Sequence, residues 1–224
     1  MYENEKREVI KAGITMDRYG LIALSGGNVS VRMPNNDILV TPSGMIYEEM
    51  VVDDVLVVDL EGNVLEGTRK PSVDTKALLY IFKKRPEINA VVHTHQPYAT
   101  AVGLVQDELP CVLTTLANTT KGSVKVAKYS SAASLDMGID TVEAIGDRLA
   151  IILKHHGVVA IGKSLKEALY ASIYLEEAAK TYIAAKTVGD VAVLDQEQVD
   201  QAVEVFKYYG QGTADLPEEL TMTR

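Results

Sequence analysis

The sequence has little cysteine and no long apolar run, and both shortages narrow the class of protein. Cys111 is the single cysteine among 224 residues, which excludes an intramolecular disulfide and makes Cys111 a packing residue by default. No apolar run reaches the length of a membrane span, so a membrane is not an expected partner. The N-terminal stretch MYENEKREVIKAG is charged and lacks the apolar region of a signal peptide. We therefore expect a soluble, cytoplasmic protein.

Positive charge is also in short supply. The chain has 22 lysines and arginines against 31 aspartates and glutamates, a net charge of −9. A nucleic-acid partner is not expected, because it would require a basic face. A small anionic substrate stays compatible, since local donors can outweigh the global charge. The hydrophobic content of 47 % is enough for a substantial core, and the length predicts one domain over residues 1–224.

Helical and strand patterns alternate along the chain. Apolar periodicity, caps and turn residues predict helices over 2–19, 72–86, 139–148, 165–188 and 196–208. Ser72 is the expected N-cap of the second of these helices. Strand-like segments are predicted within 25–32, 37–44, 53–67, 88–95, 110–115, 123–129 and 149–162. This interleaving predicts an α/β fold.

Histidine is rare, and all four histidines fall into two short clusters. VVHTHQPYATA carries His93 and His95, and KHHGVVAIG carries His155 and His156. Alternate side chains of a strand share a face, so His93 and His95 can bind one cation, with a third nitrogen from His155 or His156. An isolated histidine would more often be a buried, hydrogen-bonded residue. A strand pair with a second cluster instead favours a three-imidazole metal site with an open position, as in catalytic zinc sites.

Five motifs in order resemble the class II aldolase/adducin family. They are GGNVSVR, TPSG, KPSVDT, HTH and HHG, and the resemblance extends from the first helix to the terminal KYYGQG. It implies a three-layer α/β/α fold with a central mixed, largely antiparallel sheet. It also implies a cyclic homotetramer in which the C-terminal region reaches an active site shared with a neighbouring subunit.

The resemblance also implies which residues carry the chemistry. His93, His95 and His156 match the family's ligands for zinc or another divalent transition metal, and His156 is preferred to His155 because it directly precedes the glycine. Asp74 in KPSVDT matches an acid beside the metal that can move a proton. Tyr209 in KYYGQG matches a proton donor. Each has a simpler interpretation: Asp74 as a first-turn helix acid and Tyr209 as a packing residue at a helix end.

A phosphate site is implied by the same resemblance. The matching positions, which are small hydroxyl residues or residues of glycine-rich turns, are Ser25, Gly27, Asn28, Thr41, Ser43, Gly44 and Ser72. Such turns expose N–H groups, and Ser72 lies at a predicted helix start, which favours an anion. Ordinary turns and a cap would also account for SGGN and TPSG. Val73 replaces the family's second serine, which removes one hydroxyl.

The resemblance implies a lyase that cleaves a small ketose phosphate by retro-aldol chemistry, with other reactions open. Thr41 and Asn118, where the family's L-ribulose-5-phosphate 4-epimerases carry lysine and aspartate, favour an aldolase. Asp74-Thr75 and KYYGQ are epimerase-like, and Thr114 replaces a tyrosine of the family's aldolases. A dehydratase or decarboxylase reaction is a further alternative. A non-catalytic, adducin-like binding module is expected to lack the histidines that this chain retains.

Overall fold

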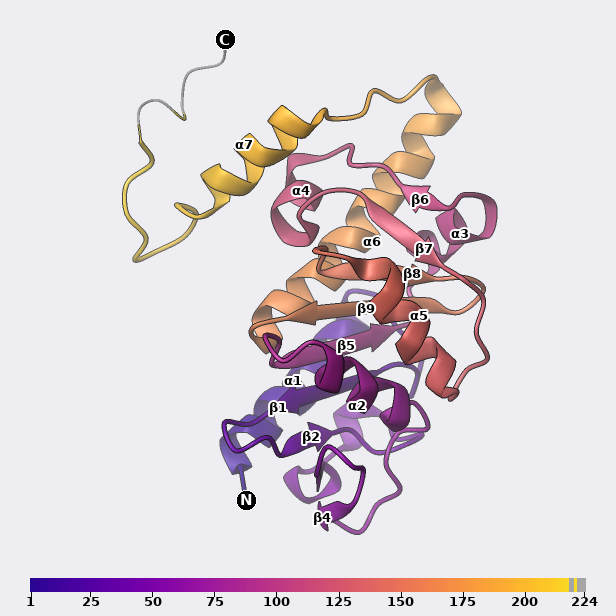
Figure 1. The fold of residues 1–224 in the computed structure, drawn as a ribbon, viewed down its shortest axis with the longest axis vertical. Coiled ribbons are helices and arrows are strands. Elements are labelled where there is room, and N and C mark those ends of the chain that lie inside the picture. Colours follow the sequence, from indigo (N-terminus) through magenta and orange to yellow (C-terminus); the bar gives the residue numbers. More distant parts are fainter. Residues whose placement is uncertain (218–219, 221–224) are drawn as a thin grey trace.

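A computed structural model describes residues 1–217 and residue 220, and its centre is one nine-stranded sheet (Figure 1). The strand order is β4-β3-β2-β1-β5-β9-β8-β7-β6. The pair β7–β8 is parallel and the other paired strands are antiparallel, so the sheet is mixed and largely antiparallel, as predicted. The strands are β1 Asn28–Arg32, β2 Ile38–Val40, β3 Leu56–Val58, β4 Val64–Glu66, β5 Ala90–Thr94, β6 Glu108–Leu109, β7 Val124–Ala127, β8 Ala150–Leu153 and β9 Gly157–Gly162.

Helices cover both faces of the sheet, with α2 and α5 on one side and α1 and α6 on the other (Figure 1). The α-helices are α1 Glu3–Arg18, α2 Thr75–Lys84, α3 Pro97–Val105, α4 Thr114–Thr120, α5 Leu135–Ile145, α6 Leu165–Val188 and α7 Gln196–Phe206. Two short 3-10 helices, η1 Tyr47–Glu49 and η2 Val52–Asp54, follow β2. None of the helices in the described ranges is both long and apolar enough to cross a membrane.

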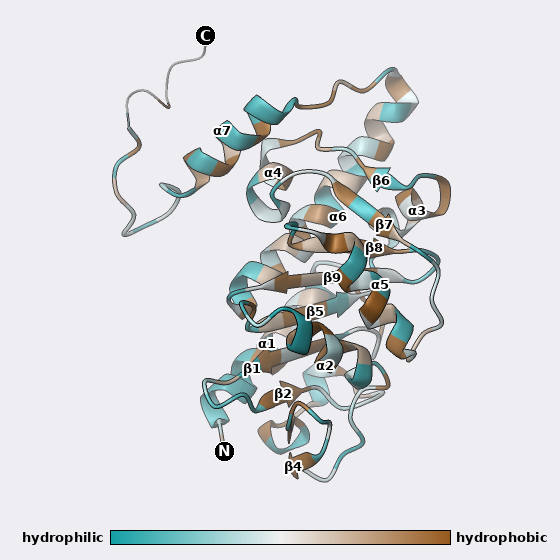
Figure 2. Cartoon of the chain, in the orientation of Figure 1, coloured by the Kyte–Doolittle hydropathy of each residue, from teal (hydrophilic) through white to brown (hydrophobic). Residues whose placement is uncertain are grey.

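Strand periodicity explains why the sheet is buried on both faces. Leu39, Val57 and Val92 pack in the apolar cluster that contains α1. Their chain neighbours Ile38, Val58 and Val91 pack in the cluster that contains α2. Because successive strand residues point to opposite faces, each of these strands contributes to two cores. Hydrophobic residues, coloured brown, are accordingly frequent in the strands (Figure 2). The three-layer arrangement is the one that the family resemblance implies.

The predicted helix limits are confirmed where a cap fixes them. α6 spans the predicted residues 165–188, and the Ser164 hydroxyl accepts a hydrogen bond from the Glu167 N–H at 3.2 Å. α2 instead begins at Thr75, with Asp74 in the N-cap position, so Ser72 is not the cap. The reason is a turn before the helix, in which the Thr75 hydroxyl donates to the Ser72 carbonyl at 2.6 Å.

The strand predicted over 110–115 is wrong. β6 ends at Leu109, and α4 begins at Thr114. The Leu113 carbonyl accepts hydrogen bonds from the N–H groups of Leu116 and Ala117, which opens a helix. The short helix α3, which Pro97 begins, was not expected from the sequence.

Candidate metal centre

His93, His95 and His156 meet at one end of the central strands. His93 lies in β5, His95 follows its last residue, and His156 ends the turn between β8 and β9. β9 runs antiparallel to β5, with Val159 paired to His93, so the turn before β9 lies beside His95. The imidazole centroids are 4.8–5.1 Å apart, and one ligand atom from each ring lies within 4.8 Å of the others.

Two glycines allow this close approach. A Cβ atom on Gly157, the residue after His156, would lie 2.1 Å from the Thr94 carbonyl oxygen. A Cβ on Gly27 would lie 2.5 Å from the His93 carbonyl oxygen, and its φ of +71° also favours glycine. The backbone contact at Gly157 is what brings the β8–β9 turn against the end of β5.

The histidine side chains are arranged to accept a cation. Nδ1 of His93 lies 2.8 Å from the Val158 carbonyl oxygen, which can only accept, so Nδ1 carries the proton and Nε2 is free to bind. That Nε2 lies 3.1 Å from Nε2 of His95. Nδ1 of His156 is buried and has no hydrogen-bond partner within the described part of the chain. These nitrogens match the donor set that divalent transition metals prefer.

Desolvation, complete for His93 and partial for His95 and His156, favours the neutral form of the imidazoles that binds metal. Desolvation lowers the pKa of His93 to about 4, against the opposing effect of Asp74. The pKa values of His95 and His156 are also lowered, first by burial, and His156 adds to the shift of His95. Neutral imidazoles at neutral pH fit a bound zinc or a similar ion.

Asp74 lies beside the histidines and is held from two directions. Its Oδ2 is 3.9 Å from Nε2 of His93 and accepts a hydrogen bond from Nδ2 of Asn28 at 2.9 Å. Its Oδ1 accepts from the backbone N–H of Ala133 at 3.2 Å. The Ala133 contact was not found by sequence reasoning, because a backbone amide 59 residues away leaves no sequence signal.

The structure brings several of the expected phosphate-site residues together. Nδ2 of Asn28 donates to the Ser72 hydroxyl at 3.2 Å, and the Ser72 N–H donates to the Thr41 carbonyl at 3.1 Å. The Ser43 N–H donates to the Lys70 carbonyl at 2.9 Å, which aligns TPSG with KPS. Gly27 directly precedes Asn28, while Ser25 and Gly44 are joined to this group by no hydrogen bond within residues 1–217. Both hydrogens of the Asn28 amide are used by Ser72 and Asp74.

Tyr209 is not brought to the histidines within this chain. It is 74 % exposed and stacks on Phe206, with ring centroids 5.3 Å apart. It follows α7, in an arm that extends away from the sheet (Figure 1). Thr114 and Asn118 lie on α4, which packs against α6 and α7. The proton-donor role of Tyr209 therefore stays a prediction.

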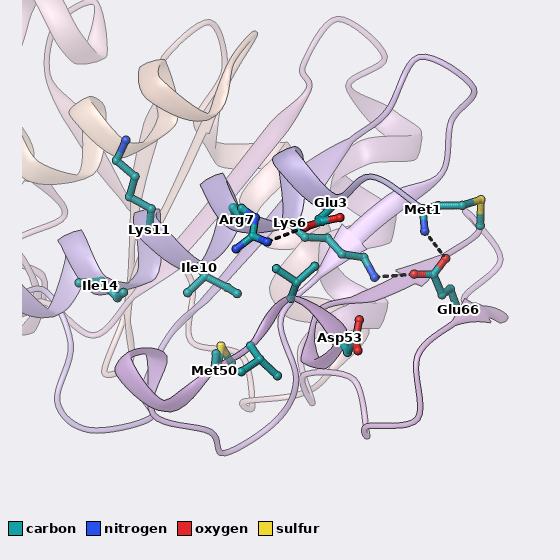
Figure 3. A pocket seen from close by; sticks show the side chains of 12 residues that line it. Met1, Glu3, Lys6, Arg7, Ile10, Lys11, Ile14, Met50, Asp53 and Glu66 are labelled. Carbon is teal, nitrogen blue, oxygen red and sulfur yellow. Dashed lines mark hydrogen bonds and ion pairs between the residues drawn. The ribbon is translucent and has the colours of Figure 1, made fainter.

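The chain also has a cavity of about 710 Å³ beside α1, and no residue that lines it belongs to the histidine site. Figure 3 shows two ion pairs in its lining: Lys6 lies 2.7 Å from Glu66, and Arg7 contacts Glu3 at 2.5 Å, whereas Lys11 and Asp53 are paired with none of the residues drawn. The amino group of Met1 lies 2.8 Å from the second oxygen of Glu66. We refer to this cavity as the α1 cavity.

A mixed sheet between two helical layers, with three imidazoles and a carboxylate at one strand end, defines a metal-binding α/β protein of the class II aldolase type. The family described as Class II Aldolase and Adducin N-terminal domain matches residues 7–183, and the chain belongs to this family.

Three similar proteins show the range of activities among its relatives. A 5-deoxy-D-ribulose 1-phosphate aldolase of Bacillus thuringiensis serovar kurstaki is 32% identical over 212 residues, 94% of this chain and 99% of the relative. An L-ribulose-5-phosphate 4-epimerase of Salmonella paratyphi C is 33% identical over 187 residues, 78% of this chain and 82% of the relative. A solved L-fuculose 1-phosphate aldolase is 32% identical, with a TM-score of 0.85 over 91% of this chain and 96% of that one.

Proposed function

We propose that the protein is a metal-dependent lyase that cleaves a small ketose phosphate by retro-aldol chemistry. The observation that carries the proposal is the convergence of His93, His95 and His156 beside the carboxylate of Asp74. The sugar-phosphate aldolases that the chain resembles over more than nine-tenths of its length support the same reaction class. The sugar itself is a matter for experiment.

His93, His95 and His156 would hold the ion, zinc or another divalent transition metal. When bound, such an ion acts as a Lewis acid that stabilises the negative charge developing on the ketose oxygens as a carbon–carbon bond breaks. The Val158 carbonyl fixes the tautomer of His93, and desolvation favours the neutral form of all three rings. The protein therefore supplies its ligands without first having to lose protons at neutral pH.

Asp74 is the proposed acid/base. Its two oxygens are oriented by Asn28 and Ala133, and its Oδ2 lies 3.9 Å from Nε2 of His93, which supports a role in proton transfer at a substrate held by the proposed ion. A general acid or base needs this kind of fixed, short-range position. We assign the phosphate to the turns around Thr41, Ser43 and Ser72. Backbone hydrogen bonds from Ser72 to Thr41 and from Ser43 to Lys70 hold these turns together.

Tyr209 is proposed to act in a homotetramer, as proton donor to the leaving aldehyde in a neighbouring subunit's site. Support comes from its position: an exposed phenol on an arm that extends beyond the body of its own chain. A phenol that reaches a metal site only across an interface would make the assembly a requirement for full turnover.

The second candidate is a 4-epimerase, and the epimerase relative at 33% identity favours it. An epimerase would retain the aldehyde fragment and re-form the bond with inverted configuration. Asn118 argues against it, because an amide cannot exchange a proton at neutral pH as the epimerase's aspartate is expected to do. An adducin-like binding module is disfavoured, because such a module has no use for three neutral imidazoles around one point.

A retro-aldol assay tests the proposal. Metal-loaded protein is offered a panel of ketose 1-phosphates and 5-phosphates with a chelator-treated control, and NMR follows the products. Chelator-sensitive release of dihydroxyacetone phosphate and an aldehyde is the expected result. A pentulose 5-phosphate that changes its C4 configuration without fragmentation would establish the epimerase instead. Full turnover in the presence of the chelator would refute both the metal-dependent aldolase and the metal-dependent epimerase.

A further inference from the structure

A fully buried polar network lies directly behind the metal ligands. Thr94 and Gln96 alternate with His93 and His95 and therefore point to the opposite face of the strand, toward α6. Thr94, Gln96 and Ser172 of α6 are all 0% exposed. Polar side chains are costly to bury unless they are paired, so a polar cluster in place of apolar packing calls for a reason.

Each polar atom of the network has a partner. The hydroxyls of Thr94 and Ser172 both donate to Oε1 of Gln96, at 2.6 and 2.9 Å. Nε2 of Gln96 donates to the Ser172 carbonyl at 3.1 Å. The Gln96 amide is thus bound to α6 through its oxygen and its nitrogen, which fixes the orientation of this side chain.

The next turn of α6 continues the same support. Glu176, four residues after Ser172 on the same helix face, accepts hydrogen bonds from the N–H groups of Tyr98 at 3.0 Å and Ala99 at 2.9 Å. These N–H groups belong to the first turn of α3, which follows Gln96. The segment 94–99, which contains His95, is therefore hydrogen-bonded to α6 at its start, through Thr94, and at its end, through Tyr98 and Ala99.

His95 needs such support because the sheet does not hold it. The β5 ladder ends at Thr94, whereas His93 is paired with β1 on one side and β9 on the other. The backbone N–H of His95 donates to the Leu21 carbonyl at 3.1 Å, and its side chain is exposed on one side. Its chain neighbours Thr94 and Gln96, in contrast, are both held in the buried network.

We propose that Gln96, bound to Ser172, is a positioning residue for the metal ligand His95. It fixes the chain just beyond β5, so that the His95 imidazole faces those of His93 and His156 without reorganisation when the ion binds. The inference rests on the metal site of the proposed function, and it acts on metal affinity and ligand geometry, not on the identity of the sugar.

A matched pair of glutamine substitutions tests the proposal. Gln96→Met keeps the length of the side chain and removes both amide contacts with α6. Gln106→Met is the control, because Gln106 follows the other end of α3 and is hydrogen-bonded to Tyr182 of the same α6 at 2.9 Å. Co²⁺ is the probe: its dissociation constant is measured by competition with a chelator, and its visible absorption spectrum reports ligand geometry.

We expect Gln96→Met to weaken Co²⁺ binding about 10-fold, the lower end of the effect of residues that orient metal ligands, and to change the spectrum. Gln106→Met should lower the melting temperature comparably and leave both metal readouts unchanged. A merely structural role for Gln96 predicts that the two variants behave alike. Co²⁺ affinity within about twofold of the unsubstituted protein, with the same spectrum, would overturn the proposal.

Ser172→Ala is the second variant, for use if Gln96→Met does not fold. It removes one donor to Oε1 of Gln96 and keeps the Ser172 carbonyl, so a smaller loss of about threefold in Co²⁺ affinity is expected. Unchanged affinity in a folded Ser172→Ala protein would count against the network. Because Co²⁺ binding is measured without substrate, the proposed function can fail while this inference stands. Failure of the unsubstituted protein to bind Co²⁺ would refute both.

Discussion

The histidine site and the α1 cavity both contain buried titratable groups, and they differ in how those groups are paired. In the α1 cavity, Glu66 accepts from Lys6 at 2.7 Å and from the Met1 amino group at 2.8 Å (Figure 3). In the histidine site, Nδ1 of His156 and Oδ1 of Asn28 are buried with no partner among the described residues.

This difference in pairing bears on which of the two sites binds a ligand. An unpaired buried polar group costs about 1–3 kcal/mol, so each one calls for an explanation. Paired charges such as Lys6 and Glu66 need nothing further. Unpaired buried atoms also occur at Arg32, Asn118 and Thr141 among the described residues, so what distinguishes the histidine site is an unpaired ring nitrogen among three convergent imidazoles.

The largest effect is expected from His95→Ala. Removal of one of three ligands should weaken metal binding by more than about 100-fold, the upper end of the effect of outer-shell changes, and activity should fall below detection. Metal content after dialysis and retro-aldol turnover are measured together. His155→Ala is the matched control, because His155 is the exposed residue next to His156 in the same turn. This variant should retain both metal and activity. Full activity without metal in His95→Ala would remove His95 from the site.

Asp74→Asn is expected to have the next largest effect. It keeps the shape of the side chain but removes the group that exchanges a proton, so turnover should fall by about 10²–10⁴-fold while metal is largely retained. Metal analysis and turnover on the same sample separate the two roles. An unchanged rate would exclude Asp74 from the mechanism, and complete loss of metal would make it chiefly a ligand.

The sequence predicted the parts of this site that follow strand periodicity and local motifs. His93 and His95 share a face because they alternate in β5, and the strand–turn–strand pattern over 149–162 placed the second cluster at a turn. The choice of His156 over His155 came from the family resemblance. The start of α6 was predicted because Ser164 and Glu167 form a clear cap.

The parts that the sequence did not reveal depend on contacts between distant segments. Ala133 binds Asp74 through its backbone, so no side-chain pattern could indicate it. The region around 110–115 resembles a strand because several of its residues are β-branched or apolar. In the structure residues 110–113 are irregular and α4 begins at Thr114, with Leu116 and Ala117 buried. A glutamine such as Gln96 is ordinary in a turn, and only its burial against α6 indicates a structural role.

The pH dependence of stability should reveal the histidine site in the metal-free protein. The folded-state pKa values of His93, His95 and His156 lie below the unfolded value of about 6.5, so the unfolded chain binds more protons. Their stabilisation is fully present above about pH 6.5 and is lost as the pH falls toward the folded values. For His93, whose folded pKa is about 4, the loss between about pH 7 and about pH 5 should be on the order of 2 kcal/mol, and the lowered pKa values of His95 and His156 act in the same direction. Urea unfolding with a chelator present measures the total.

Other groups affect this window little or with the opposite sign. Carboxylates with lowered pKa values, such as Asp54, which accepts a hydrogen bond from the Val51 N–H and pairs with Arg69, lose their contribution mainly below about pH 5. Burial raises the pKa of Glu176, so its protonation adds stability as the pH falls and partly offsets the histidines. His93→Gln should reduce the slope. A slope in His93→Gln equal to that of the unsubstituted protein would contradict the assignment.

The smallest functional effect is expected in the α1 cavity. Lys6 is 1% exposed, and Lys6→Met keeps much of its apolar side chain while removing the charge that pairs with Glu66. Glu66 is one-third exposed and retains its contact with the Met1 amino group. A lost hydrogen bond between charged groups costs about 1.5–3 kcal/mol, and the remaining partner should keep the loss of unfolding free energy near the lower value. Turnover and metal affinity should stay within about twofold, since the cavity shares no residue with the histidine site. A Lys6→Met protein with normal stability but impaired turnover would contradict this expectation, because it would give the α1 cavity a role in the reaction.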